Sequence, residues 1–336
     1  MGGMETYAKE LSEELAKVSS MTLVTLPGNA DGSAPGPWAL IRFAFRAALK
    51  SWSQGTQDII HGADMAIWPL VLLARLRSPR ARIMLSAHGT DVSYGQRPGW
   101  LPLFYAGYQW LGAFCLPAAV VLANSAITQQ MTQLLGYRTV RKIPLAARSL
   151  ECPAHAITPN RTMLFAGRVL PRKGLGWFVR EVLPRLPQDM DVAVAGTVWD
   201  VAEASVLQHP RVRNLGRLSH RELTREMSGS LCVIAPNIPL GAGHFEGFGL
   251  VAVESALAGG VIVASEMDGF LDSVAPGVTG FLIPSKSPLS WAEKIMEIAA
   301  WSPEQRKAFI QESRRQAASL FCWERVARET AAAYGL

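Results

Sequence analysis

The sequence lacks the cysteine and histidine spacings that form metal sites or disulfide frameworks. Its 336 residues include four cysteines and six histidines, with no CxxC pair and no short Cys/His cluster. This scarcity argues against a metal site and favours reduced thiols in the core of a cytosolic protein. The four cysteines are Cys115, Cys152, Cys232 and Cys322.

Signals for secretion and for nucleic-acid binding are also missing. Residues 3–18 form an acidic amphipathic pattern, which differs from the basic and apolar segments of a secretory signal. The chain has no zinc finger, no RNA-recognition signature and no long Lys/Arg run, so nucleic acid is the weakest candidate partner. We therefore expect a cytoplasmic protein, with peripheral binding to the inner face of the membrane as an open alternative.

Charged residues are absent from Pro98 to Tyr137. Within this stretch, residues 101–124 are long enough to span a bilayer. Prolines and glycines interrupt them, however, and the segment AAVVLAN reads as a buried strand that ends in a loop. We therefore favour a core helix followed by a parallel strand over a membrane span.

Positive charge is concentrated in the first half of the chain. Residues 1–150 carry 14 Lys and Arg against 8 Asp and Glu, whereas residues 151–336 carry 19 of each. The formal net charge of +6 therefore lies in the N-terminal half and suits an anionic partner. Residues 36–52 are a basic amphipathic helix, whose apolar stripe fits a membrane interface and a protein core equally well.

Apolar runs of strand length alternate with helical patterns along most of the chain. This alternation predicts parallel sheets with helices on both faces, and such sheets bind ligands at the carboxyl ends of their strands. Residues 144–161 contain three prolines and no clear period, which indicates a linker between two domains. The expected strands are residues 21–26, 58–62, 81–89, 119–124, 162–167, 191–196, 231–236 and 260–265.

Two carboxylates flank the segment GFGL, which follows a predicted strand and loop. On one straight helix, Glu246 and Glu254 would lie roughly 12 Å apart along the axis, too far to attack one sugar bond. GFGL is expected to open a helix, where free backbone N–H groups and the positive helix end favour an anion. A nucleotide sugar fits this arrangement, with its diphosphate at the helix start and its two sugars at the carboxylates.

A second cluster of charge follows the predicted strand that ends at Gly167. Arg168 and Lys173 lie on the loop before the next helix, where two cations can neutralise a leaving diphosphate without a metal. The neighbouring Arg172 reads as a solvated side chain.

With these segments in place, the chain resembles the retaining glycosyltransferases of family 4, also called glycosyl transferases group 1. The resemblance covers nearly the whole chain and implies a GT-B fold, an α/β architecture with two Rossmann-like domains facing a central cleft. It places an acceptor-binding domain at residues 1–148, a donor-binding domain at 149–318 and a helix that packs back on the first domain at 319–336. The family has a strand before the first helix, and because residues 3–18 already read as that helix, we expect this strand to be missing. The motifs are GGMETYAKELSEELAK, DIIHG, SAHGTD, VLANSAIT, AGRVLPRKG, RVRNLGRLSHREL, EGFGLVAVESALAGG, GVTGFLIP and FCWERVARETAAAY.

The resemblance also implies roles for individual residues. Arg168 and Lys173 match the pair that binds the donor diphosphate. Glu254 matches the carboxylate that binds the ribose, and Glu246 matches the one that contacts the transferred sugar. His88, which follows a predicted strand, matches a histidine that lines the cleft near the reacting sugar.

Further positions follow from the same motifs. Asp91 is expected on the acceptor side, and no metal ligands are implied. His61 in DIIHG is expected to be structural. The remaining donor-binding positions are Gly2, Gly3, Leu218, Phe248, Gly249 and Leu250.

The expected activity is therefore metal-independent, retaining transfer of a hexose from a UDP-, GDP- or ADP-sugar to a glycan or lipid-linked acceptor in polysaccharide biosynthesis. The resemblance implies no cofactor beyond the donor itself. Three other functions stay open: a GT-B phosphorylase, a non-catalytic nucleotide-sugar binder, and a membrane-associated scaffold that uses residues 36–52.

Overall fold

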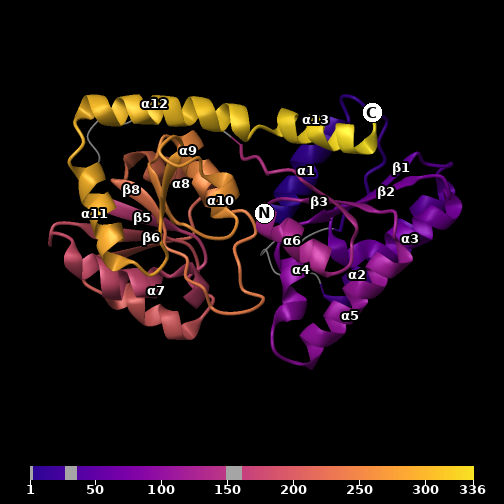
Figure 1. Ribbon diagram of the computed structural model, residues 1–336, viewed down its shortest axis with the longest axis horizontal. Helices are drawn as coiled ribbons and strands as arrows, with labels where there is room; N and C mark the ends of the chain where they lie inside the picture. The colour runs from indigo at the N-terminus through magenta and orange to yellow at the C-terminus, as the bar shows by residue number, and fades with distance from the viewer. Residues whose placement is uncertain (1–2, 27–35, 149–160) are drawn as a thin grey trace. The chain divides into compact units, whose positions relative to one another are not determined.

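The chain folds into two α/β units. The computed structural model describes residues 3–26, 36–148 and 161–336 (Figure 1). An N-terminal unit comprises residues 1–145 together with 323–336, and a C-terminal unit comprises residues 146–322. The last helix of the chain therefore belongs to the first unit.

The N-terminal unit is built on a parallel sheet in the order β1-β2-β3-β4. Each strand lies beside the next one in sequence, and every connection between them contains a helix. Right-handed crossovers that all advance in the same direction place these connecting helices on one face of the sheet. The strands are β1 (Ile59–Gly62), β2 (Arg82–Ala87), β3 (Val120–Ala123) and β4 (Thr139–Lys142).

Helices cover both faces of this sheet. α1 and the C-terminal α13 pack against each other on one face, and α2, α3 and α5 lie on the other face (Figure 1). Within that second layer, α2 packs on α3 and α3 packs on α5. The helices are α1 (Gly3–Leu15), α2 (Pro37–Ser53), α3 (Trp68–Arg77), α4 (Thr90–Ser93), α5 (Trp100–Cys115), α6 (Ala126–Leu134) and α13 (Trp323–Tyr334).

A chain of hydrogen bonds ties the first and last helices to this sheet. The Tyr7 hydroxyl of α1 lies 2.8 Å from Ser86 Oγ, which lies 2.8 Å from His61 Nε2. His61 Nδ1 lies 2.6 Å from the Tyr334 hydroxyl of α13. Both ring nitrogens of His61 therefore have partners inside the protein, as expected for a structural histidine.

The C-terminal unit contains a six-stranded parallel sheet in the order β10-β9-β8-β5-β6-β7. The chain starts in the centre with β5, runs to one edge, and returns through β8 to the other edge. This order is that of a Rossmann fold, whose ligand site lies where the strand order reverses, here between β5 and β8. The strands are β5 (Thr162–Ala166), β6 (Asp191–Ala195), β7 (Val212–Gly216), β8 (Cys232–Ala235), β9 (Ile262–Ser265) and β10 (Gly280–Ile283).

Two apolar layers bury the faces of the larger sheet. One contains Phe165, Phe178 and Trp291, and the other contains Leu164, Val233 and Phe270. Residues 175–185 form a short α turn, a π segment and a 3₁₀ turn. The helices are α7 (Leu175–Trp177), α8 (His220–Gly229), α9 (Leu250–Ala258), α10 (Phe270–Ser273), α11 (Pro288–Ala299) and α12 (Pro303–Leu320).

The described central strands of both sheets were predicted correctly, and the errors concern one segment outside the sheets and three edge strands. The strand expected at residues 21–26 is wrong, because this segment is irregular and largely exposed, with no neighbouring strand among the described residues. A strand needs the backbone groups of a partner, which a local pattern does not supply. The expectation missed three strands, β4, β7 and β10, each of which lies at a sheet edge.

The apolar segment before β3 is a helix, but it is not a core helix. In α5 the buried positions are Pro102, Gln109, Gly112 and Ala113, while the large apolar residues face outward. A Cβ on Gly112 would lie 2.9 Å from the Trp68 ring and 2.7 Å from the Tyr137 hydroxyl. Close packing therefore selects small residues for the inner side of α5, and its large residues remain on the outer side.

The apolar stripe on α2 does not lie in the core, which was one of the two positions left open for it. Ile41, Phe45 and Leu49 are 57%, 66% and 55% exposed, and Ala47 is the buried residue of this helix. Across the described residues, no helix combines the length and apolar character that crossing a bilayer requires.

The cysteines show mixed burial. Cys232 is buried in β8, whereas Cys115 and Cys322 are half-buried, and all three are free thiols. Burial raises the pKa of the Cys232 thiol to about 12, so it stays protonated and inert. Cys152 lies outside the described residues.

Candidate functional site

The loop after β5 carries three cations. Arg168 follows Gly167, and its guanidinium lies 4.6 Å from the centroid of the Trp199 ring. Arg172 and Lys173 lie in a 3₁₀ turn that ends at Gly174. Burial, assisted by the positive charge of Arg172, lowers the pKa of Arg168 from its usual value.

This loop is held against the segment that follows β8. Gly174 has φ 70°, and a Cβ there would lie 1.8 Å from the Pro236 carbonyl oxygen. The backbone N–H of Ile238 donates to the Arg172 carbonyl oxygen at 3.0 Å. Glycine is therefore required at position 174 for the two strand-end loops to approach each other.

Glu246 accepts hydrogen bonds from both loops. Its Oε2 atom lies 2.5 Å from Lys173 Nζ and 3.2 Å from the Arg172 guanidinium. Asn237, which follows β8, donates its side-chain amide to the same oxygen at 3.1 Å. The side chains of Lys173, Arg172 and Glu246 are 15%, 15% and 14% exposed, so the cluster is largely removed from solvent.

These contacts keep Glu246 ionised. Burial is the largest single influence and opposes ionisation, but the charges of Lys173 and Arg172 and the hydrogen bonds from Lys173 and Asn237 together outweigh it. The pKa of Glu246 falls to about 2 as a result. At neutral pH this carboxylate accepts hydrogen bonds and cannot act as a proton donor.

The backbone around Glu246 is fixed by the segment that follows β9. The N–H of Glu246 donates to Asp268 Oδ2 at 3.1 Å, and its carbonyl oxygen accepts from the Gly269 N–H at 3.0 Å. A Cβ on Gly269 would lie 2.4 Å from Phe248 Cα. This close contact holds Glu246 in place just before α9.

Helix α9 opens at the segment GFGL, as expected. Gly249 is its N-cap, with φ 81°, and a Cβ at this position would lie 2.5 Å from the Phe270 ring. Phe248 is buried, and its ring lies 6.1 Å from that of Phe321 in an edge-on contact. The N–H groups of the first turn of α9 thus begin directly after the cluster around Glu246, where a helix end favours an anion.

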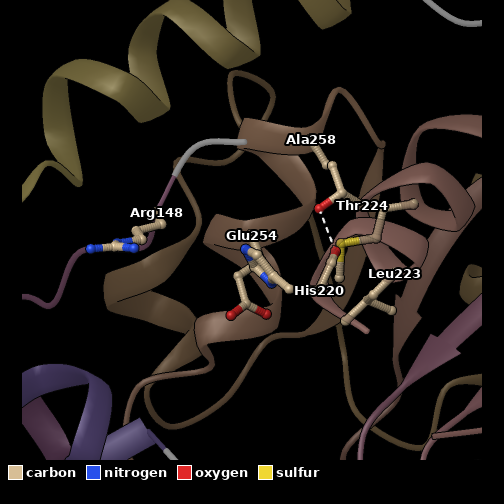
Figure 2. Close-up of a pocket in the computed structure, with 7 residues that line it drawn as sticks. Arg148, His220, Leu223, Thr224, Glu254 and Ala258 are labelled. Atoms are coloured by element: carbon tan, nitrogen blue, oxygen red, sulfur yellow. Dashed lines mark hydrogen bonds between the residues drawn. The ribbon is translucent and has the colours of Figure 1, made fainter. Parts of the chain in front are cut away.

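Glu254 lies one turn into α9 and faces a separate hollow. Figure 2 shows its carboxylate beside the His220 ring, which comes from the first residue of α8. Burial raises the pKa of Glu254, and the nearby His220 opposes the increase. The hollow is lined by Arg148, His220, Leu223, Thr224, Met227, Glu254 and Ala258.

Glu246 and Glu254 do not lie on one straight helix. Only Glu254 is helical, since α9 begins at Leu250, and Glu246 precedes the helix. The roughly 12 Å spacing expected from one continuous helix therefore does not apply. Instead, Glu246 contacts the cationic loop and Glu254 contacts α8.

In the N-terminal unit, His88 follows β2 and lines a small hollow with Tyr7 and Asn124. Its Nε2 atom lies 2.9 Å from the Ala63 carbonyl oxygen, which assigns the proton to Nε2. Its backbone N–H donates to both carboxylate oxygens of Asp91, at 2.9 and 3.0 Å. Asp91 is buried, so its carboxylate orients the His88 loop.

The described structure therefore brings together part of the predicted site. Lys173 and Glu246 are in contact, and Arg168 lies on the same loop as Lys173. Leu218 packs against the apolar layer that contains Phe270. Gly3 opens α1, whereas Gly2 lies outside the described residues.

Sequence reasoning missed several residues of this cluster. Arg172 is not a solvated side chain, because it pairs with Glu246. Asn237 and Asp268 were not singled out, although each follows the carboxyl end of a strand, where ligand-binding residues gather. His220 was also missed, because it contacts Glu254 only through the tertiary fold.

No group of three or more His, Cys, Asp and Glu side chains is arranged to hold a metal ion in the part of the chain that the structure describes.

The chain is similar in sequence to glycosyltransferases. Residues 1–146 match the family described as Glycosyltransferase Family 4, and residues 160–300 match Glycosyl transferases group 1. Glycogen synthase of Mycobacterium tuberculosis (strain ATCC 25618 / H37Rv) is 25% identical over 313 residues, which cover 86% of this chain and 72% of that protein. D-inositol 3-phosphate glycosyltransferase of Corynebacterium diphtheriae is 27% identical over 213 residues, 59% of this chain and 46% of that protein.

Solved structures show the same fold. Anabaena HepE, in complex with UDP-glucose, has a TM-score of 0.67 and 18% identity and covers 89% of this chain and 84% of that one. Sucrose-phosphate synthase from Thermosynechococcus elongatus has a TM-score of 0.71 and 20% identity and covers 99% of this chain and 93% of that one. Each of the two α/β units has a parallel sheet, and the two family matches together span most of the sequence. The chain therefore belongs to glycosyltransferase family 4 and, like these structural neighbours, has the GT-B fold.

Proposed function

We propose that the protein transfers a hexose from a nucleoside-diphosphate sugar to a glycan or lipid-linked acceptor, with retention of configuration and without a metal ion. The observation that carries this proposal is the cluster of Arg172, Lys173 and Glu246 directly before α9. It lies between β5 and β8, where the strand order reverses and Rossmann folds bind their ligands.

The cluster supplies what a departing diphosphate needs. Lys173 and Arg172 offer fixed positive charge, and the first turn of α9 adds backbone N–H groups. Arg168 adds a third cation from the same loop. In this proposal the leaving phosphate helps to deprotonate the acceptor hydroxyl, and the protein contributes orientation and charge stabilisation.

The carboxylates then bind the sugars at either side of the diphosphate. Glu246 is ionised at neutral pH and accepts hydroxyl hydrogen bonds from the transferred hexose. Glu254 accepts hydrogen bonds from the ribose. HepE has been solved with UDP and with UDP-glucose, which makes a UDP-sugar the first donor to test.

Lys173→Ala tests the proposal directly. We expect this variant to lose the thermal stabilisation that UDP, GDP or ADP gives to the wild-type protein, because the diphosphate loses a fixed cation. Release of the nucleoside diphosphate from its sugar donor, measured with water as the acceptor, should fall about 100-fold. Glu246 keeps Arg172 and Asn237 as partners, so the fold should survive.

Lys307→Ala is the matched control, because it removes an exposed lysine from α12 of the same unit. It should bind and turn over the donor as the wild-type protein does. Unchanged turnover in both Lys173→Ala and Glu254→Ala would refute the site. Release of a sugar phosphate that depends on inorganic phosphate would instead identify a phosphorylase, and tight binding without turnover would identify a non-catalytic binder.

A further inference from the structure

Two helices of the N-terminal unit expose most of the aromatic surface of the chain. Apart from Trp199, every exposed tryptophan and phenylalanine lies in α2 or α5. Trp38, Phe45 and Trp52 of α2 are 78%, 66% and 59% exposed. On α5 the corresponding residues are Trp100, Phe104, Trp110 and Phe114, which are 60–75% exposed.

The aromatic surface that these two helices expose is large. An aromatic side chain offers roughly 200 Å² of surface, so these residues, each more than half exposed, present about 700 Å² or more. The largest single apolar patch of a typical soluble monomer is roughly 300–600 Å² and is often functional. Together the two helices therefore expose enough aromatic surface to form an interface.

The charge of the same layer indicates which partner. α3 lies between α2 and α5, and none of the three helices contains an aspartate or glutamate. Arg42, Arg46 and Lys50 follow one another along α2, and the last turn of α3 contains Arg75 and Arg77. We call the outer side of these three helices the α2–α5 face.

Apolar aromatic residues beside a row of cations match the boundary of an anionic bilayer. Tryptophan rings favour the headgroup level, and each Lys or Arg near an anionic surface adds further attraction. A second copy of this chain would bring two basic faces together with no carboxylate from these helices to pair them. Lipid phosphates complement the cations, and the acyl boundary accepts the aromatic rings.

We propose that the α2–α5 face docks on the surface of an anionic lipid bilayer. The helices lie in the interface plane, with Arg42, Arg46 and Lys50 at the headgroups and the aromatic side chains at the acyl boundary. α5 has 16 residues and takes part through its outer side, without crossing the membrane. The inference stands on these helices alone and is independent of the proposed sugar transfer.

Vesicle flotation of the full chain tests the inference. The wild-type protein should float with vesicles of equimolar phosphatidylcholine and phosphatidylglycerol, and much less with phosphatidylcholine alone. Replacing Arg42, Arg46 and Lys50 by glutamine should lower the partition coefficient on the anionic vesicles by about fivefold per residue at low salt. A triple variant in which Arg213, Arg225 and Lys307 become glutamine removes three exposed cations from the other unit and should float normally.

A second set of variants tests the apolar contribution. Replacing Trp110 and Phe114 by serine changes only exposed side chains, so the fold should be retained, as circular dichroism would check. These variants should lose flotation even at low salt. They remove apolar contact with the bilayer and leave every cation in place, so stronger electrostatic attraction does not restore binding. The proposal is overturned if the wild-type protein does not bind anionic vesicles. It is also overturned if sedimentation velocity shows a dimer without lipid that dissociates in the Trp110 and Phe114 variants while flotation is unchanged.

Discussion

Glu246 is the side chain that joins the two loops of the candidate site. Its carboxylate neutralises Lys173 and Arg172, the two cations that the proposed function assigns to the donor diphosphate. In that proposal, a diphosphate competes with this carboxylate for the same positive charges. Removing the Glu246 carboxylate would leave two largely buried cations without their shared counter-ion, so substitution of this residue should have a large effect on the site.

Glu246→Gln separates the two roles of this residue. We expect tighter binding of UDP, or of whichever nucleoside diphosphate binds, because Lys173 and Arg172 lose their competing carboxylate. Transfer from the sugar donor should nevertheless fall by about 10- to 100-fold, because the hexose loses an ionised acceptor. Isothermal titration calorimetry and donor turnover measure the two effects separately.

Glu312→Gln is the matched control, since Glu312 pairs with Arg315 on the exposed side of α12. It should change neither quantity. Nucleotide affinity that stays unchanged in Glu246→Gln would show that Lys173 and Arg172 do not face the diphosphate. Full transfer activity would show that Glu246 serves only as their counter-ion.

At the scale of elements, α5 illustrates how packing distance decides which side of a helix is buried. Gly112 lies against the buried Trp68 ring, and the small Ala113 is also buried. The helix approaches its neighbours closely because these residues have little or no side chain. Its large apolar residues therefore remain outside, where they can form an interface.

Gly112→Ala should consequently destabilise the protein. The added Cβ would lie 2.9 Å from the Trp68 ring, so α5 or the ring must move, at a cost of about 1–3 kcal/mol. Gly107→Ala is the control in the same helix, because nothing lies within 4 Å of its Cβ position. That change should be neutral or stabilise the protein by up to about 1 kcal/mol. Urea unfolding of both variants measures the difference, and equal stability would contradict the packing argument.

At the scale of the whole molecule, the chain brings its first and last helices to one sheet. Tyr7 of α1 and Tyr334 of α13 are joined through Ser86 and His61. The His61 ring is half-buried, and desolvation, with a smaller effect from His88, lowers its pKa from 6.5 to about 4. The junction between the two ends of the sequence therefore contains a neutral histidine at physiological pH.

This junction should weaken in acid. Because the folded-state pKa of His61 is below the unfolded-state value, its contribution is present above pH 6.5 and is lost as the pH falls towards 4. The full change is about 3 kcal/mol of unfolding free energy. Burial raises the pKa of Asp91, which acts in the opposite direction over part of this range.

The measurement is therefore the difference in unfolding free energy between wild type and His61→Gln as a function of pH. This difference should shrink as the pH falls from 6.5 to 4, and NMR titration of the His61 ring should show no protonation near pH 6. A His61 pKa near 6.5 would contradict the assignment of this residue to a desolvated, neutral role.

Local patterns in the sequence predicted the parts of the fold that are defined by neighbouring residues. The buried strands β2, β5 and β8 appear as apolar runs, because both of their faces are covered. β4 and β7 were missed because these two edge strands are exposed or half-buried throughout and lack such runs, whereas β10 was missed although GFLI is an apolar run. For the candidate site, GFGL and Arg168 with Lys173 were recognisable as strand-end features, whereas the pairing of Arg172 and Asn237 with Glu246 was not.

The sequence by itself determined the alternation of strands and helices, the family, and the placement of cations and glycines at strand ends. These features depend on backbone conformation and on side-chain periodicity within short segments. Only the tertiary structure decided that Glu246 is bound by three residues from two loops and that α2 and α5 turn their aromatic sides to solvent. Those outcomes depend on how closely segments distant in the sequence can approach, which is set by packing across the whole unit.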